Sequence, residues 1–108
     1  MAEWTRETDV VVIGGGLAGY CAAIEAAQAG ARVLLLEKQP AVGGSTVLSG
    51  GFFAFAGTDL QQAAGVEDSN ARLFEDLRRA GGEQNDERLL AVYVDHQLEA
   101  YAWLKKIG

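Results

Sequence analysis

Residues 9–19, with the sequence DVVVIGGGLAG, decide the fold of this chain. Residues 10–13 are β-branched without interruption, a pattern typical of a buried parallel strand. An alanine-rich stretch with helical spacing follows the glycines and ends at Gly30, a residue type that suits the carboxyl end of a helix. We therefore predict a strand over residues 9–13, a tight turn, and a helix over residues 17–29.

The glycines between this strand and this helix form the pattern GxGxxG, which is typical of a dinucleotide-binding turn. Gly14 permits the tight turn, Gly16 lets the backbone approach a pyrophosphate, and Gly19 lets helix and strand pack closely. The amino end of the helix offers free N–H groups and the positive end of the helix dipole to phosphates. The alternative is a tight turn that binds no ligand. That alternative does not explain why the chain has three glycines here, since glycines lower the stability of a helix.

A second apolar run, over residues 32–36, predicts another buried strand that ends at Glu37, 18 residues after Gly19. A carboxylate at this place accepts hydrogen bonds from both hydroxyls of an adenosine ribose. It would repel a 2′-phosphate, so NADP is disfavoured, and the neighbouring Lys38 weakens this exclusion only slightly. The alternative is a solvated glutamate at the end of a strand.

A third motif, GGSTVLSGG over residues 43–51, separates two kinds of dinucleotide. FAD is longer than NAD, and its ribityl chain and ring need a second backbone cradle. Glycine N–H groups and the hydroxyls of Ser45 and Thr46 could supply donors for it, and Gly50–Gly51 lets the main chain lie flat against the ring. The motif favours FAD over the alternatives of an NAD-binding domain or a glycine-rich surface loop, and we expect residues 38–58 to form an ordered loop.

Three further helices are predicted downstream. One is short, over residues 59–64, one is capped by Asp68 or Ser69 and runs through Ala80, and one is capped by Asn85. Their apolar faces comprise Leu73, Phe74 and Leu77 in the second helix, and Leu90, Val94, Leu98, Tyr101 and Leu104 in the third.

The expected fold class is α/β, a Rossmann-type βαβ FAD-binding domain of which only the N-terminal part is present, followed by helices. Residues 1–8 form a polar lead-in. Residues 9–108 form the domain, which we expect to be incomplete at its C-terminus because a parallel sheet needs more than two strands and helices on both faces.

The composition excludes several functions. The net charge of −6 over 108 residues disfavours nucleic acid and anionic membrane surfaces as partners. No apolar run approaches the roughly 20 residues of a membrane segment. Cys21 is the only cysteine, so no internal disulfide or CxxC metal site exists, and a reducing cytoplasm is expected.

The stretch DVVVIGGGLAGYCAAIEAAQAGARVLLLEKQPAVGGSTVLSGG resembles the N-terminal FAD-binding segment of the fumarate reductase/succinate dehydrogenase flavoprotein family, which includes soluble fumarate and urocanate reductases and 3-ketosteroid dehydrogenases. The resemblance continues downstream through AGTDLQQAAGVEDS, GGEQNDERLL and AYAWLKKIG, and so covers residues 8–108.

The resemblance implies where the cofactor contacts this chain. Ala18 and Gly19 would lie at the pyrophosphate, and Glu37 and Lys38 at the ribose. With the glycine motifs, the full set of predicted cofactor-binding residues is Gly14, Gly16, Ala18, Gly19, Glu37, Lys38, Gly44, Ser45, Thr46, Ser49, Gly50 and Gly51. Members in membrane complexes attach FAD covalently through a histidine in the third motif. Since this chain has no histidine between residues 37 and 60, we expect non-covalent FAD.

The implied reaction is hydride transfer between the flavin and a carbon–carbon bond next to a carboxylate or carbonyl, in a small unsaturated or saturated acid or ketone. The family's substrate clamps and arginine proton donor lie beyond residue 108, so no catalytic residue is assigned here. The remainder of the chain or a partner subunit would supply them. A cofactor-binding fragment or subunit without activity of its own stays open as an alternative, as does an NAD-dependent dehydrogenase domain.

Other chemically notable side chains have plainer explanations. His96 is expected on the polar face of the last helix, and Cys21 as a small packing residue. Phe52, Phe53 and Phe55 follow the third motif, where core packing is favoured over a role in the wall of a substrate cavity.

Overall fold

The computed structural model describes residues 3–108, so Met1 and Ala2 of the expected lead-in lie outside the described residues. The chain divides into two compact units, an N-terminal unit that ends at Phe52 and a C-terminal unit, Phe53–Gly108. Each unit is described by itself. Within the described part of the chain, no helix has the length and apolar character that a membrane crossing requires.

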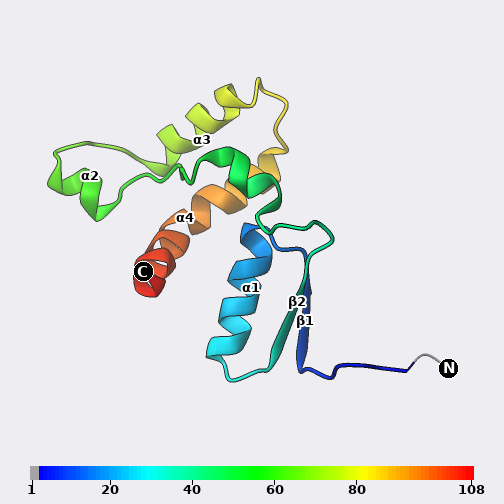
Figure 1. Ribbon diagram of the computed structural model, residues 1–108. Coiled ribbons are helices and arrows are strands. Elements are labelled where there is room, and N and C mark those ends of the chain that lie inside the picture. The colour runs from blue at the N-terminus through cyan, green and yellow to red at the C-terminus, as the bar shows by residue number, and fades with distance from the viewer. Residues whose placement is uncertain (1–2) are drawn as a thin grey trace. The chain divides into compact units, whose positions relative to one another are not determined.

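The N-terminal unit begins with a strand, a helix and a second strand, in the predicted order. Strand β1 spans Val10–Ile13, helix α1 spans Leu17–Gln28 and strand β2 spans Val33–Leu36. The strands pair in parallel, with Val10 opposite Val33 and Ile13 opposite Leu36, and α1 lies alongside them (Figure 1). This order and the parallel pairing are those of a strand–helix–strand crossover.

Both strands begin one residue later than predicted, at Val10 and Val33, and the residues just before them bond each other. The guanidinium of Arg32 donates to the carboxylate of Asp9 at 2.9 Å, and the backbone N–H of Arg32 donates to it at 2.8 Å. These side-chain bonds add to the backbone bond at the start of the sheet, which the Asp9 amide donates to the Arg32 carbonyl oxygen at 3.0 Å. The predicted helix end is confirmed, since α1 stops at Gln28 and Gly30 has a φ of 90°, which glycine adopts at no steric cost.

One face of the small sheet is open. Alternate residues of β1 point to opposite faces, and Val11 and Ile13 are 53% and 86% exposed, whereas Val10 and Val12 are half-buried.

The predicted loop after β2 contains a helical element that the sequence analysis did not anticipate. A 3₁₀-helix, η1, spans Gly44–Ser49. The preceding Gly43 has a φ of 120° and the following Gly50 a φ of 66°, so glycines form both of its ends.

The C-terminal unit consists of three helices, α2 at Asp59–Ala63, α3 at Asn70–Ala80 and α4 at Glu87–Ile107. A capping box between Thr58 and Gln61 starts α2, and the Ser69 side chain caps α3 as expected.

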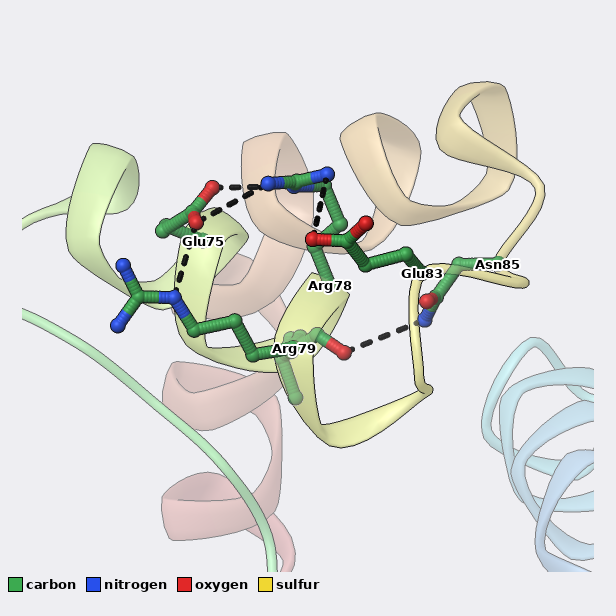
Figure 2. Close-up of polar contacts among 6 residues, drawn as sticks. Glu75, Arg78, Arg79, Glu83 and Asn85 are labelled. Carbon is green, nitrogen blue, oxygen red and sulfur yellow. Dashed lines mark hydrogen bonds and ion pairs between the residues drawn. The ribbon is translucent and has the colours of Figure 1, made fainter.

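The predicted cap of α4 is wrong. Asp86, not Asn85, caps this helix, and its carboxylate accepts hydrogen bonds from the amides of Arg88 and Leu89. The Asn85 side chain instead reaches back to the carbonyl oxygen of Leu77 at 3.3 Å, which also accepts from the Gly81 amide at the end of α3 (Figure 2).

Charged side chains reinforce the same end of α3. Glu75 pairs with Arg78 and with Arg79, each at 3.0 Å, and Arg78 also pairs with Glu83 at 3.3 Å (Figure 2). These pairs hold the turn that leads into Asn85.

The core of the C-terminal unit lies between α3 and α4. Ala56, Leu73 and Val94 form it, and Phe74 and Leu77 pack against it, so the predicted apolar face of α3 is confirmed. The predicted stripe of α4 is correct at Leu90 and Val94, which are buried, but wrong at Leu98, which is 42% exposed. Gln97 is buried in its place, with 1% of its surface exposed.

Candidate functional site

The two glycine motifs meet at the amino end of α1, inside the N-terminal unit. The amide of Gly43 donates to the carbonyl oxygen of Gly15 at 2.7 Å, and the amide of Leu17 donates to the hydroxyl oxygen of Thr46 at 3.0 Å. Residues separated by about thirty positions in the sequence therefore form one continuous backbone surface around the start of the helix.

Two of the glycines in the first motif are required by the chain itself. Gly14 has a φ of 106°, a conformation that side chains with a Cβ rarely adopt. A Cβ at Gly19 would overlap the carbonyl oxygen of Gly14, so only glycine lets α1 approach the end of β1 this closely.

Gly16 is different, because nothing inside the chain requires a glycine there. Its φ of −85° suits any residue, and a Cβ would lie 3.7 Å from its nearest neighbours, the Gly43 carbonyl oxygen and the Thr46 hydroxyl oxygen. The missing side chain leaves room for something outside the protein to approach the backbone.

The amides around Gly16 are available to that ligand. Among residues 3–108, the N–H groups of Gly16, Ala18 and Gly19 have no hydrogen-bond partner, while the N–H of Leu17 is occupied by Thr46. Unpaired amides together with the positive end of a helix dipole form an anion site, and a pyrophosphate fits this donor set.

Glu37 follows β2 and turns back onto the glycine turn. One carboxylate oxygen accepts from the amide of Gly15 at 2.8 Å, and the other accepts from the amide of Gln39 at 2.9 Å. The hydrogen bond from the Gln39 amide contributes most to lowering the pKa of Glu37, and the bond from the Gly15 amide adds to it. Both bonds favour the ionised carboxylate. A carboxylate offers roughly four acceptor positions, so positions remain for ribose hydroxyls.

The second glycine motif lies on η1 and just after it. The hydroxyl of Ser49 donates to the Thr46 carbonyl oxygen at 2.7 Å and accepts from the Gly51 amide at 3.2 Å, so Ser49 shapes the turn. Gly50 and Gly51 have φ values of 66° and 79°, in the left-handed region that favours glycine. Ser45 is exposed.

All twelve predicted site residues belong to the N-terminal unit. Three of them meet at the amino end of α1. Thr46 bonds the Leu17 amide and lies next to Gly16, and Glu37 bonds the amide of Gly15, the residue before Gly16. Gly44 also lies there, since a Cβ on it would be 3.8 Å from the Cα of Gly16. Lys38 is exposed, and its backbone amide and its charge help to lower the pKa of the neighbouring Glu37.

The sequence analysis missed two residues of this junction. Gly15 is buried and bonds both Glu37 and Gly43, and Gly43 has no room for a side chain because a Cβ would overlap Val47. The signal was present in the sequence, because Gly15 is one glycine more than GxGxxG requires and Gly43 is the first residue of GGSTVLSGG.

The other notable side chains lie elsewhere. His96 is 63% exposed and faces Glu99 at 3.3 Å. Phe53 and Phe55 stack at 5.5 Å, and Phe55 packs edge-on against Tyr101, whereas Phe52 is 87% exposed. Throughout the described chain, no three His, Cys, Asp or Glu side chains gather as metal ligands would.

A parallel strand–helix–strand unit with a glycine turn, free helix-end amides and an acidic residue after the second strand defines a nucleotide-cofactor-binding protein. The family model described as FAD binding domain matches residues 9–108, and the chain therefore belongs to this family of FAD-binding domains.

Individual relatives are reductases and a dehydrogenase. The chain is 41% identical over 100 residues to a fumarate reductase (cytochrome) of Shewanella frigidimarina, covering 93% of this chain and 18% of that protein. It is 44% identical over 100 residues to a urocanate reductase of Eggerthella lenta, covering 93% of this chain and 16% of the relative.

A solved structure gives the same picture. The crystal structure of a 3-ketosteroid-Δ4-(5α)-dehydrogenase from Rhodococcus jostii RHA1 matches with a TM-score of 0.80 and 45% identity, over 98% of this chain and 22% of that chain. This chain thus spans only 16% to 22% of the length of these relatives.

Proposed function

We propose that this chain is the FAD-binding portion of a flavoprotein oxidoreductase, with residues 9–108 as a Rossmann-type domain that binds FAD non-covalently. The observation that carries the proposal is the junction of the two glycine motifs at the amino end of α1. There the amides of Gly16, Ala18 and Gly19 are unpaired, and Gly16 itself carries no side chain although a Cβ would fit within the chain.

Each predicted residue has a role at this junction. The amides around Gly16 hold the pyrophosphate, and Glu37 accepts the ribose hydroxyls while Lys38 lies beside them. The remaining residues border the pyrophosphate, the ribityl chain and the ring, and they are Gly44, Ser45, Thr46, Ser49, Gly50 and Gly51. Thr46 keeps its hydroxyl hydrogen for donation, because its oxygen only accepts from Leu17.

The position of the histidine supports non-covalent binding. His96 is the single histidine of the chain, and it lies on α4 in the C-terminal unit, far along the sequence from the second glycine motif. In the family members that bind FAD covalently, the attaching histidine lies in the motif that corresponds to residues 43–51, and this chain has no histidine between residues 37 and 60.

The proposed reaction reduces or forms a carbon–carbon double bond next to a carboxylate or carbonyl. The named substrates of the relatives, fumarate, urocanate and a 3-ketosteroid, share this chemical feature and support an unsaturated or saturated acid or ketone as substrate. FAD supplies the hydride chemistry when bound, and this chain supplies binding and orientation. Catalytic side chains would come from the remainder of the chain or a partner subunit. The expected location is the cytoplasm, where Cys21 keeps its free thiol.

The test is a spectrum of the full-length gene product purified without added cofactor. We expect a yellow protein with flavin absorption, and acid precipitation should release the flavin into the supernatant as FAD. Flavin that stays in the pellet would contradict non-covalent binding. A colourless protein that binds NAD would contradict the whole proposal.

A second candidate is a cofactor-binding subunit without activity of its own. The observation that favours it is the exposure of Val11 and Ile13, which leaves one face of the sheet without a cover in the described residues. Substrate-dependent oxidation of a reduced dye by the purified chain alone would exclude this candidate, and activity that appears only with a second polypeptide would support it.

A further inference from the structure

Phe52, the last residue of the N-terminal unit, is a large apolar residue outside any core. It is 87% exposed, so the core packing that the sequence favours is wrong at this position. Phe53 and Phe55 stack on each other, whereas no aromatic ring contacts Phe52 in the part of the chain that the structure describes. A single exposed ring is common on protein surfaces, and it is the position of this ring that points to a function.

The ring of Phe52 lies over the second glycine motif. Its Cδ2 and Cε2 carbons lie 3.3 Å from the place that a Cβ on Gly50 would occupy. A tight turn brings the ring there, since the Phe52 amide donates to the carbonyl oxygen of Ser49 at 3.4 Å and the Gly51 amide donates to the Ser49 hydroxyl at 3.2 Å. The missing side chain at Gly50 therefore gives the ring its place against the backbone of the motif.

The two glycine motifs present different chemistry to a ligand. The first motif offers the unpaired amides of the α1 amino end, which suit an anion. The second motif carries exposed apolar side chains, because Val47 and Leu48 of η1 are exposed as well as Phe52. FAD has the same division, with a charged pyrophosphate in its middle and an aromatic isoalloxazine ring at one end.

We propose that Phe52 is a cofactor-contacting residue whose ring packs against the isoalloxazine ring of FAD. This inference rests on the proposed function, in which Gly50 and Gly51 lie beside that ring. Since the Phe52 ring lies against Gly50, it borders the same position. Two aromatic rings gain free energy from offset or edge-to-face contact in addition to the apolar area that they bury. The bound flavin thus covers a ring that the described chain leaves in water.

The test compares Phe52→Ala and Phe52→Tyr with the control Trp4→Ala in the full-length protein. Trp4 is also an aromatic residue of the N-terminal unit and is 85% exposed, but it lies outside both glycine motifs. Isothermal titration calorimetry of each apoprotein gives the dissociation constants for FAD and for ADP. ADP carries the adenosine ribose and two phosphates but no flavin ring, so it reports on the first motif alone.

We expect Phe52→Ala to raise the dissociation constant for FAD about fivefold to tenfold and to leave that for ADP unchanged. Phe52→Tyr keeps the ring and should keep the wild-type constants, as should Trp4→Ala. A Phe52→Ala protein that binds FAD as tightly as wild type would overturn the proposal. Equal losses of FAD and ADP affinity would overturn it as well, because they would indicate damage to the glycine turn.

A second variant covers the case in which Phe52→Ala does not fold. Phe52→Leu keeps an apolar side chain without the aromatic ring and should weaken FAD binding by a smaller factor, again without a change for ADP. A wild-type affinity of Phe52→Leu for FAD would contradict the proposal. If the wild-type protein binds no FAD, the proposed function has failed. If it binds FAD and the variants match it, only the role of Phe52 has failed.

Discussion

The hydroxyl oxygen of Thr46 accepts a hydrogen bond from the backbone amide of Leu17 at 3.0 Å. Leu17 is the first residue of α1, and Thr46 lies in η1, so a side chain from the second glycine motif caps the helix that the first motif begins. Gly16, the residue at the usual capping position, has no side chain for this purpose. The cap therefore comes from a distant residue, and the Gly16 position stays open.

Replacing Thr46 with valine tests this cap. Valine has the same shape but cannot accept from the Leu17 amide, so we expect a loss of about 1 kcal/mol in the free energy of unfolding, as for other lost helix caps. FAD binding should weaken as well, because η1 loses its link to α1. Thr46→Ser keeps the hydroxyl and should restore both properties. Denaturant unfolding and FAD titration of the two variants measure this, and equal behaviour of the valine and serine variants would rule out the capping role.

Replacing Glu37 with glutamine tests the link between β2 and the glycine turn. The pKa of Glu37 is lowered by the amides of Gln39 and Gly15, so its ionised form stabilises the folded state. This contribution is fully present above the unfolded pKa of about 4.3 and is lost as the pH falls through the lower folded pKa. We expect Glu37→Gln to melt at a lower temperature than wild type at pH 7, and the difference to shrink at pH 3. A difference that stays constant from pH 7 to pH 3 would contradict the assignment.

Replacing Gly19 with alanine tests the close approach of α1 to β1. The new Cβ would overlap the carbonyl oxygen of Gly14, and backbone cannot move aside as a side-chain end can. We expect destabilisation at the upper part of the roughly 1–3 kcal/mol range for overpacking, despite the higher helix propensity of alanine. Gly30→Ala serves as a control for φ strain, since a Cβ at Gly30 meets nothing within 4 Å but its φ is 90°. A stable Gly19→Ala protein would mean that helix and strand are further apart.

The local parts of the fold could be predicted from the sequence because their signals are local. The strand over residues 10–13, the helix that Gly30 terminates and the Ser69 cap each depend on neighbouring residues only. Position 97 could not be predicted in this way. A glutamine in a helix is exposed by default, and its burial depends on the Ala56 backbone, 41 residues earlier.

The same distinction holds at the candidate site. The glycine motifs, the acidic residue Glu37 and the family resemblance, which added Ala18 and Lys38, together selected the site residues as predictions. The role of each residue could not be predicted in the same way. The hydrogen bond from the Leu17 amide to the Thr46 hydroxyl oxygen, for example, joins residues 29 positions apart. The wrong prediction for the cap of α4 concerns two residues that are adjacent in the sequence. Asn85 and Asp86 are both good capping residues, and in the structure Asp86 caps α4 while Asn85 bonds the C-terminal turn of α3.

The central claim is that Gly16 serves a ligand and not the fold, and the replacement Gly16→Ala tests it most directly. A Cβ at this position would lie 3.7 Å from its nearest neighbours in the chain. The free energy of unfolding of the apoprotein should therefore change by less than about 1 kcal/mol, and its melting temperature should change little. The same methyl group would stand between the backbone amides and the pyrophosphate. We therefore measure FAD binding by fluorescence titration of the full-length Gly16→Ala apoprotein, beside its thermal melt. The account predicts a folded protein whose FAD affinity falls at least tenfold. A folded Gly16→Ala protein that binds FAD as tightly as wild type would contradict it.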